Sequence, residues 1–187
     1  NGDNSSCSGC TDESANNHNS DATIDDGSCN YDHFYFELAN TGADQMVIFS
    51  DEISSIEFGD EIGVFDLNGL LSNQDCSDQY GEILVARTTW TGSQANETAI
   101  GSIDYCQFED GYQLPGYVEN NPVIFRVWDA SEGVEYDAIA TISGGGDPLF
   151  ENTSFVVVLE LDLVTYGCID VEACNYNSDA NADDGSC

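Results

Sequence analysis

Cysteines and oxygen-bearing side chains recur at the same spacing near both ends of this chain. Residues 9–29 and 167–187 align without gaps and are identical at fourteen of 21 positions. The shared positions are small or polar, so residues 1–29 (the N-terminal module) and 167–187 (the C-terminal module) carry almost no apolar core. A disulfide and a metal ion are the features that could fold segments of this kind.

Six of the eight cysteines fall into three pairs. Two pairs frame the modules and close loops of equal length, and closing such a loop contributes roughly 3 kcal/mol of stability. The third pair contains the only cysteines of the middle of the chain. We therefore predict disulfides between Cys10 and Cys29, between Cys168 and Cys187, and between Cys76 and Cys106.

Cys7 and Cys174 remain, and neither has an equivalent in the other module. They could bond within one chain if its ends meet. Cys174 of one subunit could equally bond Cys7 of the next, and such a head-to-tail contact does not close and so generates a filament.

Oxygen-bearing residues fall at alternate positions inside both modules. Calcium takes six to eight oxygen ligands, and side chains at every second position of a turning loop can converge on one point. The alternative is that these Asn and Asp residues form Asx turns in a solvated loop. The candidate ligands are Asn17, Asn19, Asp21, Thr23, Asp25 and Asp26, their counterparts Asn175, Asn177, Asp179, Asn181, Asp183 and Asp184, and additionally Asp12 and Asp170.

In spacing, these loops resemble EF-hand and thrombospondin type 3 calcium loops. They depart from the EF-hand because Ala22 and Ala180 replace its glycine, and Ser28 and Ser186 replace its bidentate glutamate. A helix-loop-helix context is therefore not expected.

As a whole, each module resembles the cysteine-framed modules of large secreted and surface proteins of marine Bacteroidetes and related bacteria. The resemblance rests on the pattern GCxDxxAxNYNxxAxxDDGSC and covers about a quarter of the chain, with His18 in place of the tyrosine in the first copy. It implies a secreted or cell-surface protein of multidomain, repetitive architecture.

The chain's acidity limits its partners. Of its 187 residues 36 are Asp or Glu and 2 are Arg, which gives a net charge of −34. Nucleic acids and anionic lipids are not expected to bind, since that attraction depends on Lys and Arg. Mutual repulsion of the carboxylates favours bound divalent cations, or else a surface adapted to salty water.

The compartment is indicated by the cysteines and by hydropathy. Eight cysteines in so polar a chain favour an oxidising, extracellular environment, and we expect any secretion signal to have been removed or to lie outside this sequence. The longest apolar run, residues 155–159, is too short to span a membrane, which takes about 20 residues.

Residues 30–166 alternate short apolar runs with Gly, Asn and Asp turns, which predicts an all-β domain, a single β-sandwich of about nine strands. The large aromatics, including Trp90 and Trp128, are predicted to be core or sheet-packing residues. Residues 59–69, 127–133 and 142–146 also resemble a β-sandwich domain of the same secreted proteins. The predicted strands are 33–38, 45–49, 55–58, 61–67, 82–89, 98–103, 123–129, 134–143 and 155–164.

The sequence offers little evidence of a catalytic site. The two histidines, His18 and His33, both lie near the start, and lysine is absent, so no Ser-His-Asp or Cys-His arrangement is expected. We predict no catalytic residues and no enzyme activity.

The main hypothesis is a calcium-binding, disulfide-stabilised subunit of an extracellular fibre that assembles head to tail with itself. The alternative is a monomeric carbohydrate-binding or adhesion module, with surface glycans as partners; a glycan-active enzyme is a third hypothesis.

Overall fold

The chain is described by a computed structural model that covers residues 8–13, 15, 18–29 and 31–187. It forms two compact units, Asn1–Tyr35 and Phe36–Cys187. The first unit holds the N-terminal module, and the second holds the central domain together with the C-terminal module. The described residues contain strands and turns and no helix, which confirms the all-β prediction.

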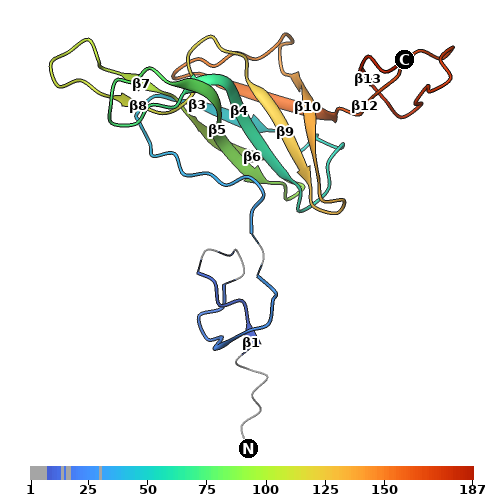
Figure 1. The fold of residues 1–187 in the computed structure, drawn as a ribbon, viewed down its shortest axis with the longest axis horizontal. Helices are drawn as coiled ribbons and strands as arrows, with labels where there is room; N and C mark the ends of the chain where they lie inside the picture. Colours follow the sequence, from blue (N-terminus) through green and yellow to red (C-terminus); the bar gives the residue numbers. More distant parts are fainter. Residues whose placement is uncertain (1–7, 14, 16–17, 30) are drawn as a thin grey trace, which may run out of the picture. The chain divides into compact units, whose positions relative to one another are not determined.

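One seven-stranded sheet dominates the second unit (Figure 1), in the order β5-β4-β9-β10-β11-β3-β6. Six neighbouring pairs make up this order, and five of them are antiparallel. The exception is β11 with β3, which run parallel. The strands are β3 (Asp44–Phe49), β4 (Glu61–Leu70), β5 (Tyr80–Thr89), β6 (Ala95–Ile100), β9 (Ile124–Asp129), β10 (Val134–Ile142) and β11 (Phe155–Leu163).

The sheet nearly closes on itself. Its two end strands, β5 and β6, are joined by residues 90–94 and lie close to each other, so the sheet curls like a barrel (Figure 1). The predicted sandwich of two packed sheets is therefore not confirmed. A strongly twisted single sheet can cover its own inner face, and no second large sheet is then needed to enclose the core.

The core lines the inner face of this sheet. Alternate residues point inward, as in β3, where Gln45, Val47 and Phe49 are buried, while Met46 is exposed and Ile48 is half-buried. Trp90 is buried in this core, and Trp128 is half-buried on β9, in line with the predicted core and sheet-packing roles. The largest buried side chains from the other strands include Ile62, Val64, Val85, Phe125, Val127, Val158 and Leu161.

Two predicted strands are not strands in the structure. Residues 33–38 alternate in polarity, but they pair with no strand among the described residues. Leu38 instead packs against the core from a loop. Residues 55–58 form bends and turns, and Ile56 is buried from there. Apolar spacing therefore identified residues that contact the core without identifying strand pairing.

Glu160 fastens the loop before β4 to β11. Its carboxylate accepts hydrogen bonds from the Ser54 hydroxyl at 2.9 Å, the Ser55 hydroxyl at 2.9 Å and the main-chain N–H of Leu161 at 3.1 Å. Burial raises the pKa of Glu160, but these hydrogen bonds outweigh it and lower the pKa to about 2 from an ordinary 4.5.

Replacing Glu160 by Gln should lower the stability of the sheet at neutral pH. Because the folded-state pKa is lowered, the carboxylate's contribution is complete above 4.5 and is lost as the pH falls toward about 2. The difference in urea midpoint between wild type and E160Q should shrink over that window. A difference that stays constant with pH would contradict this role.

Candidate functional site

The two modules have the same local fold. In the N-terminal module β1 (Ser8–Gly9) pairs in parallel with β2 (Ile24–Asp25), and in the C-terminal module β12 (Tyr166–Gly167) pairs in parallel with β13 (Ala182–Asp183). The turns match as well: Asn19 N–H donates to the Cys10 carbonyl at 2.9 Å, and Asn177 N–H donates to the Cys168 carbonyl at 2.9 Å.

Close packing explains the shared glycine and alanine of the modules. A Cβ added at Gly9 would lie 3.1 Å from the Asn19 side-chain nitrogen and 3.3 Å from the Ala22 Cβ. At Gly167 the equivalent distances to Asn177 and Ala180 are 3.0 and 3.1 Å. The alanine that replaces the EF-hand glycine thus packs against the module's first glycine, and this loop is built differently from an EF-hand.

Three disulfides join the cysteines that the sequence paired. Cys10–Cys29 and Cys168–Cys187 close the modules, with Cα–Cα distances of 4.7 and 4.8 Å. Cys10 and Cys168 are buried within their small modules. Cys76–Cys106 lies in the central domain. The disulfides therefore supply much of what holds each module, because few of its other residues are buried.

Several of the predicted calcium ligands accept a hydrogen bond from the main-chain N–H two residues later. Such Asx turns stabilise loops without a metal ion. The same turns occur in both modules, at distances between 2.9 and 3.1 Å. The accepting side chain and the donating N–H of each turn belong, in the N-terminal module, to Asn19 and Asp21, Asp25 and Gly27, and Asp26 and Ser28. In the C-terminal module they belong to Asn177 and Asp179, Asp183 and Gly185, and Asp184 and Ser186.

Serine reinforces the last of these turns in each module. The pKa of Asp26 is lowered because the side chain and the main-chain N–H of Ser28 donate to it. The pKa of Asp184 is lowered in the same way by Ser186. Both carboxylates are fully exposed and therefore ionised at neutral pH, the state in which they could bind a cation.

The remaining candidates have separate roles. Asp12 accepts from the Tyr31 hydroxyl at 2.7 Å, and Asp170 accepts from the main-chain N–H of Glu172 at 2.9 Å. Asn175 donates to the Ser186 carbonyl at 2.7 Å. Thr23 is exposed, and Asn17 lies outside the described residues.

Asn181 links the C-terminal module to the end of β11. Its side-chain oxygen accepts from Thr165 N–H at 2.8 Å, and its side-chain nitrogen donates to the Leu163 carbonyl at 2.8 Å. The Tyr166 hydroxyl adds a bond to Asp137 of β10 at 2.9 Å. One of the predicted ligands, Asn181, thus attaches the module to the sheet.

In the part of the chain that the structure describes, no three His, Cys, Asp or Glu side chains come together in a metal-binding arrangement. Calcium also takes amide and main-chain oxygens as ligands. Calcium binding by the modules remains a prediction. The geometry of the described carboxylates matches the Asx-turn alternative.

Cys174 is an exposed free thiol in the C-terminal module. Its proposed partner, Cys7, lies outside the described residues. The structure therefore leaves a thiol exposed on the surface of the C-terminal module.

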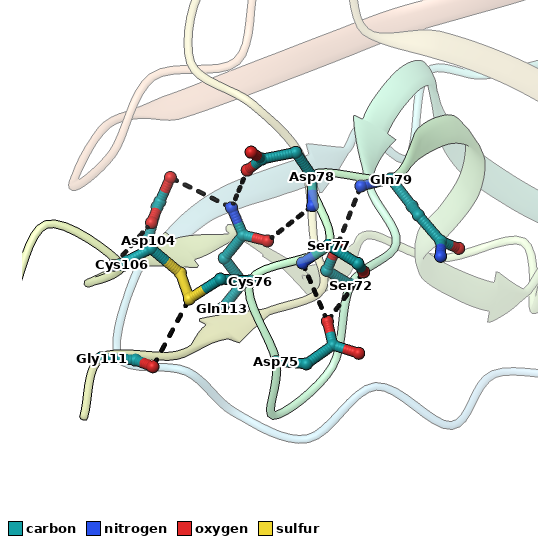
Figure 2. Close-up of a disulfide and its surroundings, with 10 residues drawn as sticks. All are labelled: Ser72, Asp75, Cys76, Ser77, Asp78, Gln79, Asp104, Cys106, Gly111 and Gln113. Carbon is teal, nitrogen blue, oxygen red and sulfur yellow. Dashed lines mark hydrogen bonds between the residues drawn. A yellow bond between two sulfur atoms is a disulfide. The ribbon is translucent and has the colours of Figure 1, made fainter.

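The Cys76–Cys106 disulfide clamps a loop pair at one end of the sheet (Figure 2). It joins the loop between β4 and β5 to the hairpin of β7 (Ile103–Asp104) and β8 (Gln113–Leu114). Gln113 is fully buried beneath it, where its side-chain nitrogen donates to Asp78 at 2.6 Å and to Asp104 at 3.1 Å. Its side-chain oxygen accepts from Asp78 N–H at 3.2 Å.

Three aromatic side chains gather on the hairpin tip that this network supports. Tyr105 lies 6.3 Å from Phe108 and 5.8 Å from Tyr112 between ring centroids. All three are exposed, Phe108 to 63%. We call Tyr105, Phe108 and Tyr112 the aromatic tip. From the sequence, the large aromatics are predicted to be core or sheet-packing residues. These three lie in a stretch that contains Gly and Asp and lacks strand alternation, and this signal could have separated them from the others.

No described helix is long and apolar enough to cross a membrane. The three disulfides indicate an oxidising, extracellular environment.

Comparisons of the chain with models of known protein families, with curated proteins and with solved structures find no match.

Proposed function

We propose that this chain is a structural subunit of an extracellular bacterial fibre, joined head to tail through its two end modules. The joint would consist of a disulfide between Cys174 of one subunit and Cys7 of the next, with calcium between facing acidic loops. The second candidate is a monomeric adhesion or carbohydrate-binding module of a larger surface protein.

The observation that carries this proposal is the parallel pairing of β3 with β11. The chain enters β3 from the N-terminal side at Asp44 and leaves β11 toward the C-terminal module at Leu163. Because the strands are parallel, these two points lie toward opposite ends of the pair. Tension between the chain's ends therefore pulls the two strands past each other along their length.

Hydrogen bonds hold this strand pair along its whole overlap. Met46 N–H donates to the Ser154 carbonyl at 3.1 Å at one end, and Ser50 N–H donates to the Val158 carbonyl at 2.9 Å at the other. Thr153 N–H adds a bond to the Asp44 carbonyl at 2.8 Å. Bonds that lie across the direction of pull share the load and must break together, which is the arrangement that suits a load-bearing subunit.

Charge explains why the joint would need a cation. A net charge of −34 makes contact between two copies unfavourable unless the carboxylates are offset. The exposed, ionised side chains of Asp26 and Asp184 occupy equivalent places in the two modules. The resemblance of the modules to those of secreted bacterial surface proteins supports the same conclusion.

Electron microscopy of the full chain tests this proposal. Protein incubated with calcium and without reductant should form filaments that loosen or break when EGTA is added. Non-reducing electrophoresis should show a ladder of covalent oligomers. Cys174→Ser should abolish that ladder while leaving the fold intact, since the side chain is exposed.

The outcomes separate the two candidate functions. Filaments that survive EGTA but are lost in C174S would support a disulfide joint and contradict the calcium joint. Dispersed single particles under all conditions would overturn the fibre proposal and favour the monomeric module.

A further inference from the structure

We propose that the aromatic tip, Tyr105, Phe108 and Tyr112, is a binding site for a neutral polysaccharide. This inference stands independently of the fibre proposal, because it concerns a separate surface, the β7–β8 hairpin. It would give the protein an adhesive function in addition to a structural one.

The first argument is the exposure of three touching rings. Phe108 is 63% exposed, Tyr105 44% and Tyr112 38%. Aromatic side chains contribute most to stability when buried, and these three do not belong to the core cluster. A group of exposed rings rimmed by polar residues marks a binding surface more often than a single exposed ring does.

The second argument is that the tip is built rigidly. Main-chain bonds connect Tyr105 N–H to the Tyr112 carbonyl at 3.0 Å, Phe108 N–H to the Tyr105 carbonyl at 2.9 Å and Gly111 N–H to the Phe108 carbonyl at 3.1 Å. A Cβ at Gly111 would lie 2.0 Å from the Tyr105 carbonyl oxygen, so only glycine fits this turn.

The disulfide and the buried Gln113 add to this rigidity from below (Figure 2). These features hold in place the backbone that carries the three rings, while the rings themselves stay exposed. A surface that is ordered before binding loses less conformational entropy when the ligand binds, and this raises affinity.

The chemistry of the rim points to a sugar. Pyranose rings present apolar C–H faces, which pack on aromatic rings, and hydroxyl groups at their edges, which donate hydrogen bonds. Asp104, Glu109 and Asp110 lie on the same hairpin, and Glu109 and Asp110 are exposed acceptors next to Phe108 in sequence. Rings and carboxylates together fit a ligand that is apolar on its faces and hydroxylated at its edges.

The ligand must also be uncharged. Sulfated and uronic acid polysaccharides would be repelled by a net charge of −34. Both arginines are engaged elsewhere, Arg126 with Glu82 at 2.8 Å and Arg87 with Glu61 at 3.8 Å. The tip therefore has no cation with which to recognise an anionic polymer.

Affinity electrophoresis tests the proposal. The full chain carrying C174S, in EGTA, would be run in gels containing xyloglucan, galactomannan or laminarin, and sedimented with cellulose or chitin. We expect retention on at least one of these neutral polysaccharides. Phe108→Ala should weaken binding about ten-fold, a change equivalent to about 1.4 kcal/mol.

Phe58→Ala is the matched control, because Phe58 is a single phenylalanine exposed to 81% outside the hairpin. It should bind as the parent does. Lack of retention on all five polysaccharides, or equal losses in F58A and F108A, would overturn the proposal. So would binding only to poly-lysine, which would identify the tip as a site for a basic protein. Because C174S and EGTA remove the proposed subunit joint, failure of polymerisation does not affect this result.

Discussion

Pulling the chain by its two ends should unfold the central sheet at a several-fold higher mean force than pulling apart the two strand starts at residues 44 and 155. The reason is the parallel register, in which Met46 pairs with Phe155 and Phe49 pairs with Val158. End-to-end tension slides β3 along β11 and loads all of their hydrogen bonds together. Pulling at residues 44 and 155 opens the same bonds one after another.

Single-molecule force spectroscopy can compare the two directions in one protein. Handles would be attached at the chain ends in one sample and at D44C and F155C in the other, both on a C174S background. Phe155 is 68% exposed, so its replacement leaves the core unchanged. Forced unfolding reports the rate of crossing the barrier rather than equilibrium stability, so the folded state can be equally stable in both samples.

Equal forces in the two directions would contradict the load-bearing role of the β3–β11 pair. Higher force in the end-to-end direction would support a subunit that transmits tension, whichever bond joins one subunit to the next.

Replacing Asp66 by Ala should have the largest effect on equilibrium stability among changes to the acidic residues. Asp66 is 1% exposed and lies within β4. It accepts from Val118 N–H at 2.8 Å, from Asn68 N–H at 2.8 Å and from the side-chain nitrogen of Asn121 at 3.0 Å. Removing the carboxylate leaves these donors without their partner, which costs about 3 to 5 kcal/mol.

Asp162→Ala is the matched control, because Asp162 is an exposed residue on β11. Urea denaturation should show a large loss of stability for D66A and almost none for D162A, since surface substitutions usually change stability by less than about 0.5 kcal/mol. Equal small losses in the two variants would mean that water replaces the Asp66 carboxylate, and would contradict its role in fastening the 118–121 turn to β4.

The disulfides illustrate what could be predicted locally. The gapless repeat placed Cys10 opposite Cys29 and Cys168 opposite Cys187, and the two remaining central cysteines had to pair with each other. These inferences needed only spacing along the chain. The strand predictions at 61–67, 123–129 and 134–143 succeeded for the same reason, because alternation within one strand is a local property.

The roles of individual acidic residues were not predictable in this way. The chain has 36 Asp and Glu residues, yet Asp60, directly before β4, and Asp66, within β4, are buried acceptors. Asp60 accepts from Glu57 N–H at 2.7 Å and from Ala130 N–H at 3.0 Å. Besides near neighbours such as Glu57, Ala130 donates to Asp60 from 70 residues away, and Val118 donates to Asp66 from 52 residues away. The burial of the two carboxylates therefore follows from the assembled sheet.

The sequence by itself determined the all-β class, the three disulfide pairs and the repeat of the end modules, because each depends on residue types at fixed local spacing. Only the tertiary structure decided the curling of one sheet in place of a sandwich, the parallel pairing of β3 with β11 and the exposure of the aromatic tip. These depend on contacts between segments far apart in the sequence, more than a hundred residues for β3 and β11, and side-chain alternation is the same whichever strand lies alongside.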